Sequence, residues 1–148
     1  MRANTRLAVA IHILTLLALD NPKEVLNTSE NLALSVNTNP VVVRRIIAML
    51  KKAKLVNVKA GVGGASLARN PKNITWLDVY NAVKSNDDFT LFNKHENPNK
   101  KCYVGAYILD VIDEPLHMAQ KAMEDKLSTF TLYDTMVPIA EKNNIQLR

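Results

Sequence analysis

The feature that most constrains the fold is a change of hydrophobic period at residue 55. Before it, Asn39-Pro40 opens a helical pattern, because Asn caps helices well and Pro is tolerated at the first helical position. After it, residues 55–59 and 65–68 read as short strands joined by the glycine-rich turn 60–64. The apolar positions of the helical pattern are Val43, Ile46, Ile47 and Leu50. The sequence therefore predicts a helix that leads directly into a two-stranded ribbon.

Two shorter helical patterns flank this unit. Asn27 can cap the first, with Glu30 reaching back to it as the third helical residue, and residues 37–39 break the pattern. The second spans about Thr75–Lys84, with Thr75 as its cap and Asp78 near the positive end of its dipole. The apolar residues of the first pattern are Leu32, Ala33 and Val36.

The N-terminal stretch has two readings. Arginines precede the apolar residues 7–19, as in a secretory signal peptide. However, His12 interrupts the stretch, and residues 20–22 offer no clear small-residue cleavage site. We therefore expect a core helix that is capped by Asn4 and ends near Leu19, with His12 in the core or lining a groove.

The C-terminal half begins with a polar segment, residues 85–101, which we expect to be a loop or linker. A long amphipathic pattern follows, and Pro115 inside it should kink or split the helix. The tail beyond residue 131 contains another short helix, expected to end near Pro138. The apolar stripe of the long pattern consists of Val104, Ile108, Val111, Ile112, Leu116, Ala119, Met123 and Leu127.

Charge is distributed unevenly along the chain. Residues 1–72 hold 11 Lys/Arg and 3 Asp/Glu, whereas residues 73–148 hold 8 Lys/Arg and 11 Asp/Glu. A basic half joined to an acidic half indicates that the first half meets a polyanion. A randomly basic surface is the alternative.

The order of helix, short helix, tight turn, basic helix and ribbon is that of a winged helix-turn-helix. We expect a mainly α chain with a small β-ribbon, divided into a winged-helix domain over 1–84, a linker over 85–101, and a dimerisation helix with its tail over 102–148. No apolar run reaches the ~18 residues that a membrane span needs.

The basic helix and its neighbours carry side chains suited to double-stranded DNA. Arginine pairs with guanine, asparagine reads adenine, and valine contacts a thymine methyl. The candidates for reading bases are Asn39, Val41, Val42, Arg44 and Arg45. The candidates for contacting the phosphate backbone are Arg2, Thr5, Thr28, Ser29, Lys59 and Gly61. The glycines alone also fit an ordinary hairpin, and Lys51, Lys52 and Lys54 also fit a solvated helix end.

The sequence resembles the Rrf-two family of bacterial transcriptional regulators. The stretches that carry the resemblance are Thr28–Ala33, Asn37–Arg45, Leu50–Val56, Gly61–Gly64, Ile74–Tyr80 and Cys102–Gly105. The resemblance implies a homodimeric, cytoplasmic, DNA-binding repressor in which the long C-terminal helix, here residues 103–127, pairs with its twin. The amphipathic stripe gives an independent reason for a dimer, although packing within one chain would also cover it.

Cysteine content separates this chain from many members of that family. Those members hold an iron–sulfur cluster through three cysteines in the loop before the long helix, whereas this chain has only Cys102. We therefore expect no cluster, no other cofactor and no metal, because His95 and Cys102 are too few ligands for a closed zinc site. Cys102 and His95 remain a possible sensor, since Lys100 and Lys101 favour the thiolate. A cysteine packed at the start of the dimer helix is the alternative.

The ribbon with its turn, residues 55–68, is the wing of such a fold, and it departs from the family as well. Members often carry arginine just before the first wing glycine, where this chain has Ala60, preceded by Lys59. An arginine suited to the minor groove is therefore absent from that place.

Two other classes of function compete with DNA binding. Winged helices also serve as protein-interaction modules, so this chain could regulate a partner enzyme or regulator. An enzyme is disfavoured, because His95 and His117 have no evident nucleophile or base beside them. The expected function is a cluster-free repressor that binds a two-fold symmetric operator.

Overall fold

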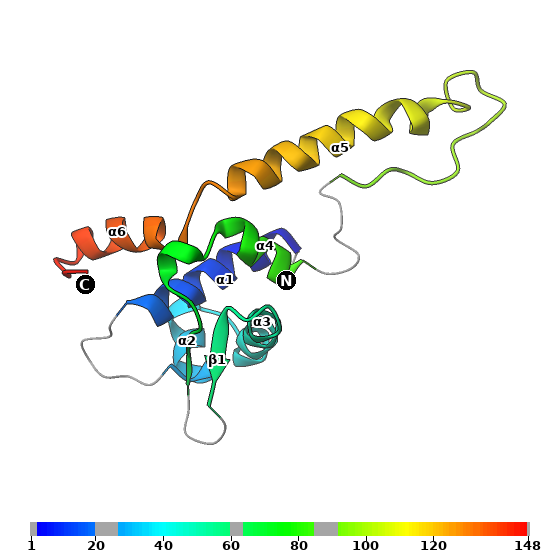
Figure 1. The fold of residues 1–148 in the computed structure, drawn as a ribbon. Helices are drawn as coiled ribbons and strands as arrows, with labels where there is room; N and C mark the ends of the chain where they lie inside the picture. The colour runs from blue at the N-terminus through cyan, green and yellow to red at the C-terminus, as the bar shows by residue number, and fades with distance from the viewer. Residues whose placement is uncertain (1–2, 20–26, 60–63, 85–91, 148) are drawn as a thin grey trace.

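The structure, a computed structural model, describes residues 3–19, 27–59, 64–84 and 92–147. It confirms a mainly helical winged-helix fold (Figure 1). The elements are α1 (Ala3–Ala18), α2 (Ser29–Val36), α3 (Pro40–Lys52), β1 (Val56–Val58), β2 (Ala65–Leu67), the 3-10 helix η1 (Pro71–Asn73), α4 (Trp76–Val83), α5 (Ile108–Leu127) and α6 (Leu132–Lys142). None of the described helices combines the length and hydrophobicity of a membrane-spanning segment.

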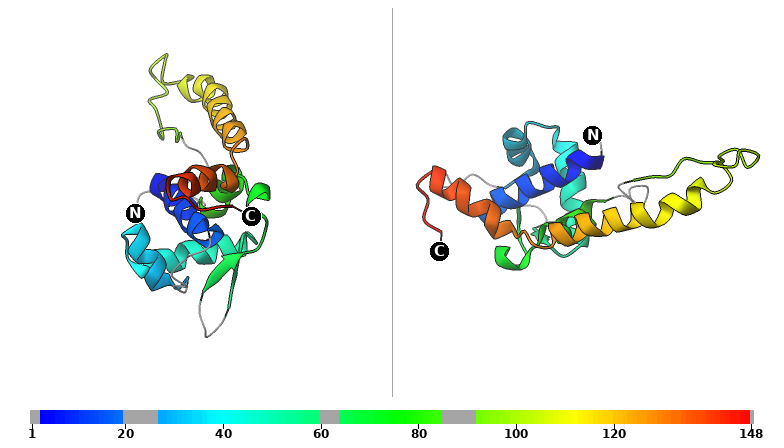
Figure 2. Two further views of the ribbon diagram at one scale, coloured as in Figure 1. Left: turned by 90° about the vertical axis from the view of Figure 1, so that its left-hand side faces the viewer. Right: turned by 90° about the horizontal axis from the view of Figure 1, so that it is seen from above.

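A compact unit surrounds α1, which contacts α2, α3, α4, α6 and β2. The unit is held by burial of apolar side chains, and Ile13, Leu14, Val43 and Leu50 are fully or almost fully buried. Strands β1 and β2 pair antiparallel from Val56 opposite Leu67 to Val58 opposite Ala65. The ribbon and α5 project from opposite sides of this unit (Figures 1 and 2).

The caps of the helix-turn-helix are partly as predicted. Asn39 caps α3 by accepting the N–H of Val41 at 2.9 Å, and Pro40 is the first helical residue. Asn37 ends α2 in the left-handed conformation, with a φ of 61°. The predicted cap of α2 is wrong by one residue, because Thr28 accepts the N–H of Asn31 at 3.2 Å.

The first helix also begins earlier than predicted, because α1 starts at Ala3 and Asn4 therefore lies inside it. Both strands are shorter than predicted, since β1 begins at Val56 and β2 ends at Leu67. Hydrogen-bonded turns occupy residues 102–107, so α5 starts at Ile108, after the first residue of the predicted stripe.

The split that was one alternative at Pro115 and the predicted end of the last helix near Pro138 are both wrong. Helix α5 is not split at Pro115, and α6 continues through Pro138 to Lys142. A proline inside a helix removes one backbone hydrogen bond, but tertiary packing can outweigh that loss. For α6 the packing is visible, because Leu132, Met136 and Ala140 are buried. For α5 the described part of the chain provides no comparable burial, since Gln120 is its one buried residue.

Helices α4 and α6 begin side by side. Thr75 and Thr131 form an antiparallel bridge, and each caps its helix in a reciprocal capping box, with Asp78 and Asp134 respectively. The cap predicted at Thr75 is therefore confirmed. Trp76 lies beside this bridge, where its indole N–H donates to Thr135 Oγ1 at 3.3 Å. The segment that contains α5 therefore leaves the compact unit at the end of α4 and returns to it beside the start of α4.

Candidate nucleic-acid interface

The N-terminal half of α3 presents a mixed polar and apolar surface. Val41 is 48% exposed and the side chains of Arg44 and Arg45 point outward, because Val43, Ile46, Ile47 and Leu50 occupy the buried face. Val42 is half-buried and packs against the core, so it is less available than predicted. The carboxamide oxygen of Asn39 is already occupied by its capping bond, which leaves its NH₂ group as the donor toward a ligand.

The two arginines of α3 differ in their surroundings. The guanidinium of Arg44 forms an ion pair with Glu30 of α2. A backbone N–H hydrogen bond at Glu30 itself, followed by the bond and charge of Arg44, holds the pKa of the Glu30 carboxyl below its usual range. Arg45 forms no ion pair with any residue in the described part of the chain. Arg45 is therefore the arginine that can reach a ligand without first losing a partner.

A small hollow of about 230 Å³ adjoins Arg45 between α1 and α3. Arg6 lines it as well and anchors α1 to α4 by donating to the carbonyl of Val83 at 2.9 Å. Sequence reasoning missed Arg6, although its place one residue after Thr5 in the basic half was a signal. The remaining lining residues are Val42, Ile46 and Met49.

The predicted phosphate contacts lie on several elements. Thr5 is exposed on the first turns of α1, and Lys59 is exposed just after β1. Thr28 and Ser29 are half-buried at the start of α2, and the hydroxyl of Thr28 is engaged in capping. Arg2 and Gly61 lie outside the described residues.

The ribbon is attached to the helix-turn-helix near its turn end. The N–H of Ala65, the first residue of β2, donates to the carbonyl of Asn27 at 3.2 Å. Gly64 precedes it with a φ of 133°, a conformation that side chains rarely adopt, and a Cβ there would approach Asn27. Asn27, predicted as a helix cap, thus anchors the wing instead.

The apolar stripe of α5 is only partly covered, because its residues are half-buried or exposed. None of the eight stripe residues is buried, and the one buried residue of α5 is Gln120, whose side-chain amide donates to Tyr80 Oη of α4 at 3.2 Å. Val111 and Met118 are 66% and 63% exposed. Lys94 joins the preceding segment to α5 through Asp113 at 2.6 Å. We call residues 92–127 the arm.

The predicted sensor residues are both exposed on the arm, but no hydrogen bond joins His95 to Cys102. Backbone N–H groups of Gly105 and then Val104 lower the pKa of the Cys102 thiol. The turn is tight, because a Cβ on Gly105 would lie 2.3 Å from the carbonyl oxygen of Asn99. In the described part of the chain, no three His, Cys, Asp or Glu side chains gather as a metal site would require.

Comparison with known proteins agrees with this geometry. The model of the Rrf2 family, described as an iron-dependent transcriptional regulator, matches residues 3–138. YwnA of Bacillus subtilis (strain 168), named as an HTH-type transcriptional regulator, is 50% identical over 133 residues, which are 90% of this chain and 96% of YwnA.

Solved structures agree too. One described as a DNA-binding protein is 45% identical, with a TM-score of 0.69 over 88% of this chain and 98% of its own. IscR of T. potens is 21% identical, with a TM-score of 0.65 over 100% of this chain and 94% of its own, a likeness that concerns the fold alone.

Proposed function

The chain belongs to the Rrf2 family of transcriptional regulators, and we propose that it is a cytoplasmic, homodimeric repressor that binds a two-fold symmetric operator without an iron–sulfur cluster. The observation that carries the proposal is the exposed N-terminal half of α3, with Val41 and Arg45 beside a two-stranded ribbon. In a winged helix-turn-helix this end of the second helix enters the major groove. A bound dimer excludes other proteins from its operator, which is the basis for proposing repression.

Several groups would position the protein on the phosphate backbone. Thr5, Lys59 and the N-terminus of α2 at Thr28 and Ser29 supply hydroxyl, ammonium and backbone N–H donors. Arg2 and Gly61 join this set on sequence grounds alone. Arg44 would exchange Glu30 for a guanine or phosphate on binding, whereas Arg45 has no ion pair among the described residues to exchange.

The incompletely buried stripe of α5 supports the homodimer. An amphipathic helix that leaves its own compact unit gains stability by packing its apolar face against a second helix. The same stripe on a second copy is a self-complementary partner related by a two-fold axis. Such an axis would set two copies of α3 on successive turns of one face of the DNA, about 34 Å apart.

The donor groups do not fit an iron–sulfur cluster, although the family description names iron. Cluster irons are held mainly by cysteine thiolates, and the sequence contains one cysteine. No step of the proposed function therefore passes through iron. The sensor role of Cys102 is supported by its exposure and by the lowered pKa of its thiol. His95 is exposed as well but forms no hydrogen bond with Cys102.

Selection of bound sequences from random duplex DNA, with reduced, folded full-length protein at physiological salt, tests the proposal. We expect enrichment of an inverted repeat whose half-sites lie about 10 bp, or a multiple of it, apart. Loss of binding on adding salt should accompany it. Failure to enrich any sequence would favour the alternative function, a protein-interaction module that regulates a partner.

A further inference from the structure

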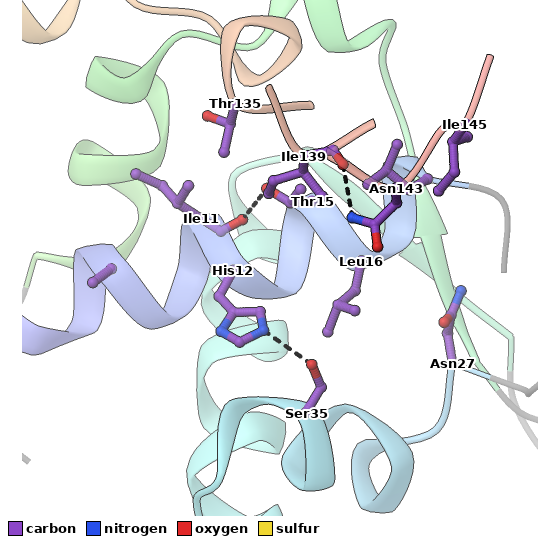
Figure 3. A pocket seen from close by; sticks show the side chains of 12 residues that line it. Ile11, His12, Thr15, Leu16, Asn27, Ser35, Thr135, Ile139, Asn143 and Ile145 are labelled. Atoms are coloured by element: carbon purple, nitrogen blue, oxygen red, sulfur yellow. Dashed lines mark hydrogen bonds between the residues drawn. The ribbon is translucent and has the colours of Figure 1, made fainter. Parts of the chain in front are cut away.

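An open cavity of about 690 Å³ lies along α1, between α2 and α6 (Figure 3). Sites for small organic molecules have volumes of about 300–1,000 Å³ and mostly apolar walls with a few polar groups. This cavity fits both criteria, since its apolar wall is formed by Ala8, Ile11, Leu16, Leu19, Ile139 and Ile145. No residue of α3 is among those that line it.

One polar pair marks the α2 side of the cavity. His12 of α1 reaches toward Ser35 of α2, and its Nε2 lies 3.0 Å from Ser35 Oγ (Figure 3). Neither side chain has a further hydrogen bond to a described residue. If the ring donates, the serine hydroxyl hydrogen stays free, and if the serine donates, the Nδ1–H of a neutral ring stays free. Either arrangement leaves one donor for an oxygen atom of a ligand.

The other polar groups are less available. The hydroxyl of Thr15 donates to the Ile11 carbonyl at 2.7 Å, and the amide of Asn143 donates to the Ile139 carbonyl at 2.8 Å. The lining contains no Lys, Arg, Asp or Glu. A multiply charged ligand would therefore lose its hydration without gaining a counter-ion, which is unfavourable.

The cavity is connected to the candidate DNA interface through two of its lining residues. Ser35 lies on α2, the helix whose Glu30 pairs with Arg44 of α3. Asn27 holds the wing through its carbonyl, which accepts the N–H of Ala65. A ligand that moves α2 or this segment relative to α1 changes how α3 and the wing are presented together. Coupling of this kind alters DNA affinity and ligand affinity by the same factor.

We infer that this cavity is an effector site for a small, mainly apolar molecule with one oxygen-bearing acceptor group, such as an aromatic or medium-chain monocarboxylate. The apolar body lies against the aliphatic side chains, and the oxygen accepts from the His12–Ser35 pair. Occupation changes DNA affinity, and this regulatory half of the inference rests on the proposed function. The ligand-binding half does not.

The test uses 8-anilinonaphthalene-1-sulfonate, an aromatic probe with one anionic oxygen-bearing group, titrated calorimetrically into the full-length protein. Ala8 is exposed at the cavity edge, so the side chain of Ala8→Trp fills cavity space without entering the core. This variant should lower the affinity for the probe at least about tenfold. Glu141→Trp places the same side chain on an exposed position of α6 outside the lining, and should leave the probe affinity unchanged. Ser35→Ala should weaken the probe about 2- to 10-fold, as expected for one lost hydrogen bond.

Three results would overturn the inference about binding. The first is that Ala8→Trp binds the probe as tightly as wild type, and the second is that Glu141→Trp loses as much probe affinity as Ala8→Trp. The third is that Ala8→Trp dissociates a dimer in sedimentation. The last result would mean that a second copy of the chain occupies the cavity.

The regulatory half is tested by titrating the probe with and without a saturating duplex of the selected operator. We expect the probe affinity to change by about 5- to 150-fold, and Ala8→Trp should abolish that difference. An affinity that the duplex leaves unchanged would refute the regulatory half alone. If no operator can be selected, the proposed function has failed, whereas the probe titrations still decide the binding half.

Discussion

The compact unit and the arm differ in how far the apolar faces of their helices are buried within one chain. In the compact unit the apolar faces of α1, α3 and α6 meet within one chain, and Leu14, Val43 and Leu132 are almost completely buried. In the arm, α5 has a comparable apolar stripe, yet none of its residues is buried and Val111 is 66% exposed. Hydrophobic periodicity therefore predicts that a helix has a partner, but it does not reveal whether the partner belongs to the same chain.

The largest expected effect sharpens the distinction between buried and exposed apolar residues. Leu32 and Leu34 lie on the same helix, at 2% and 80% exposure. Leu32→Ala should lower the free energy of unfolding by about 2–5 kcal/mol, because it leaves a cavity in the core. Leu34→Ala should change it by less than about 0.5 kcal/mol. Urea unfolding at one protein concentration measures both, and equal losses would contradict the described packing of α2.

The next effect concerns the surface of α3. Arg45→Ala should cost about 1–3 kcal/mol of operator affinity and relax specificity at one base pair. Arg44→Ala should cost a similar or smaller amount, because wild-type Arg44 must first give up Glu30. Operator affinity is measured by titrating a fluorescently labelled operator duplex with each variant. Lys142→Ala, which removes an exposed charge on α6, is the control. If Arg44→Ala and Arg45→Ala both bind like wild type while folded, α3 is not the reading surface.

A smaller effect is expected at the turn end of the wing. Lys59 is exposed just after β1, and Lys59→Ala should reduce the slope of log affinity against log salt by about one, as for one lost phosphate contact. Specificity should not change, since a phosphate contact carries no sequence information. An unaltered slope would mean that Lys59 makes no such contact.

The smallest effect lies on the arm and leaves DNA affinity unchanged. Because backbone N–H groups lower the pKa of Cys102, its thiolate should form at a lower pH than that of a short peptide with the sequence of residues 99–106. Alkylation by iodoacetamide, followed against pH, compares the two. Gly105→Ala should raise the midpoint toward that of the peptide, since a Cβ collides with Asn99 and opens the turn. Identical midpoints for protein and peptide would refute the lowered pKa.

Much of the compact unit could be predicted because its local signals agree with its packing. Asn39-Pro40 and Thr75 with Asp78 begin helices in the structure as the sequence predicts. The apolar positions of α3 are buried as expected. At such sites capping chemistry and hydrophobic spacing favour the same conformation.

The failures occur where tertiary contacts override a local signal. Asn27 is a good cap by residue type, but its carbonyl anchors β2 and Thr28 caps α2 instead. Pro138 is a stop signal by residue type, but burial of Met136 and Ala140 carries α6 past it. Of the two positions expected for His12, the groove-lining one is confirmed, since His12 is exposed and lines the cavity. The extent of the cavity could not be predicted, because it depends on α6 folding back against α1 from the far end of the chain.

The most direct test of the division between a reading unit and a dimerising arm is a ratio of two affinities. Wild type and Val111→Glu are titrated with the selected inverted-repeat duplex and with a duplex of one half-site, and Lys121→Glu on α5 is the control. We predict that wild type and Lys121→Glu prefer the full site at least about 100-fold, as two linked binding units do. Val111→Glu places a charge on the apolar stripe of α5. It should bind the half-site with wild-type affinity and lose the preference for the full site. A variant that sediments as a monomer yet keeps the full-site preference, or keeps both the preference and the dimer, would contradict the assignment of dimerisation to α5.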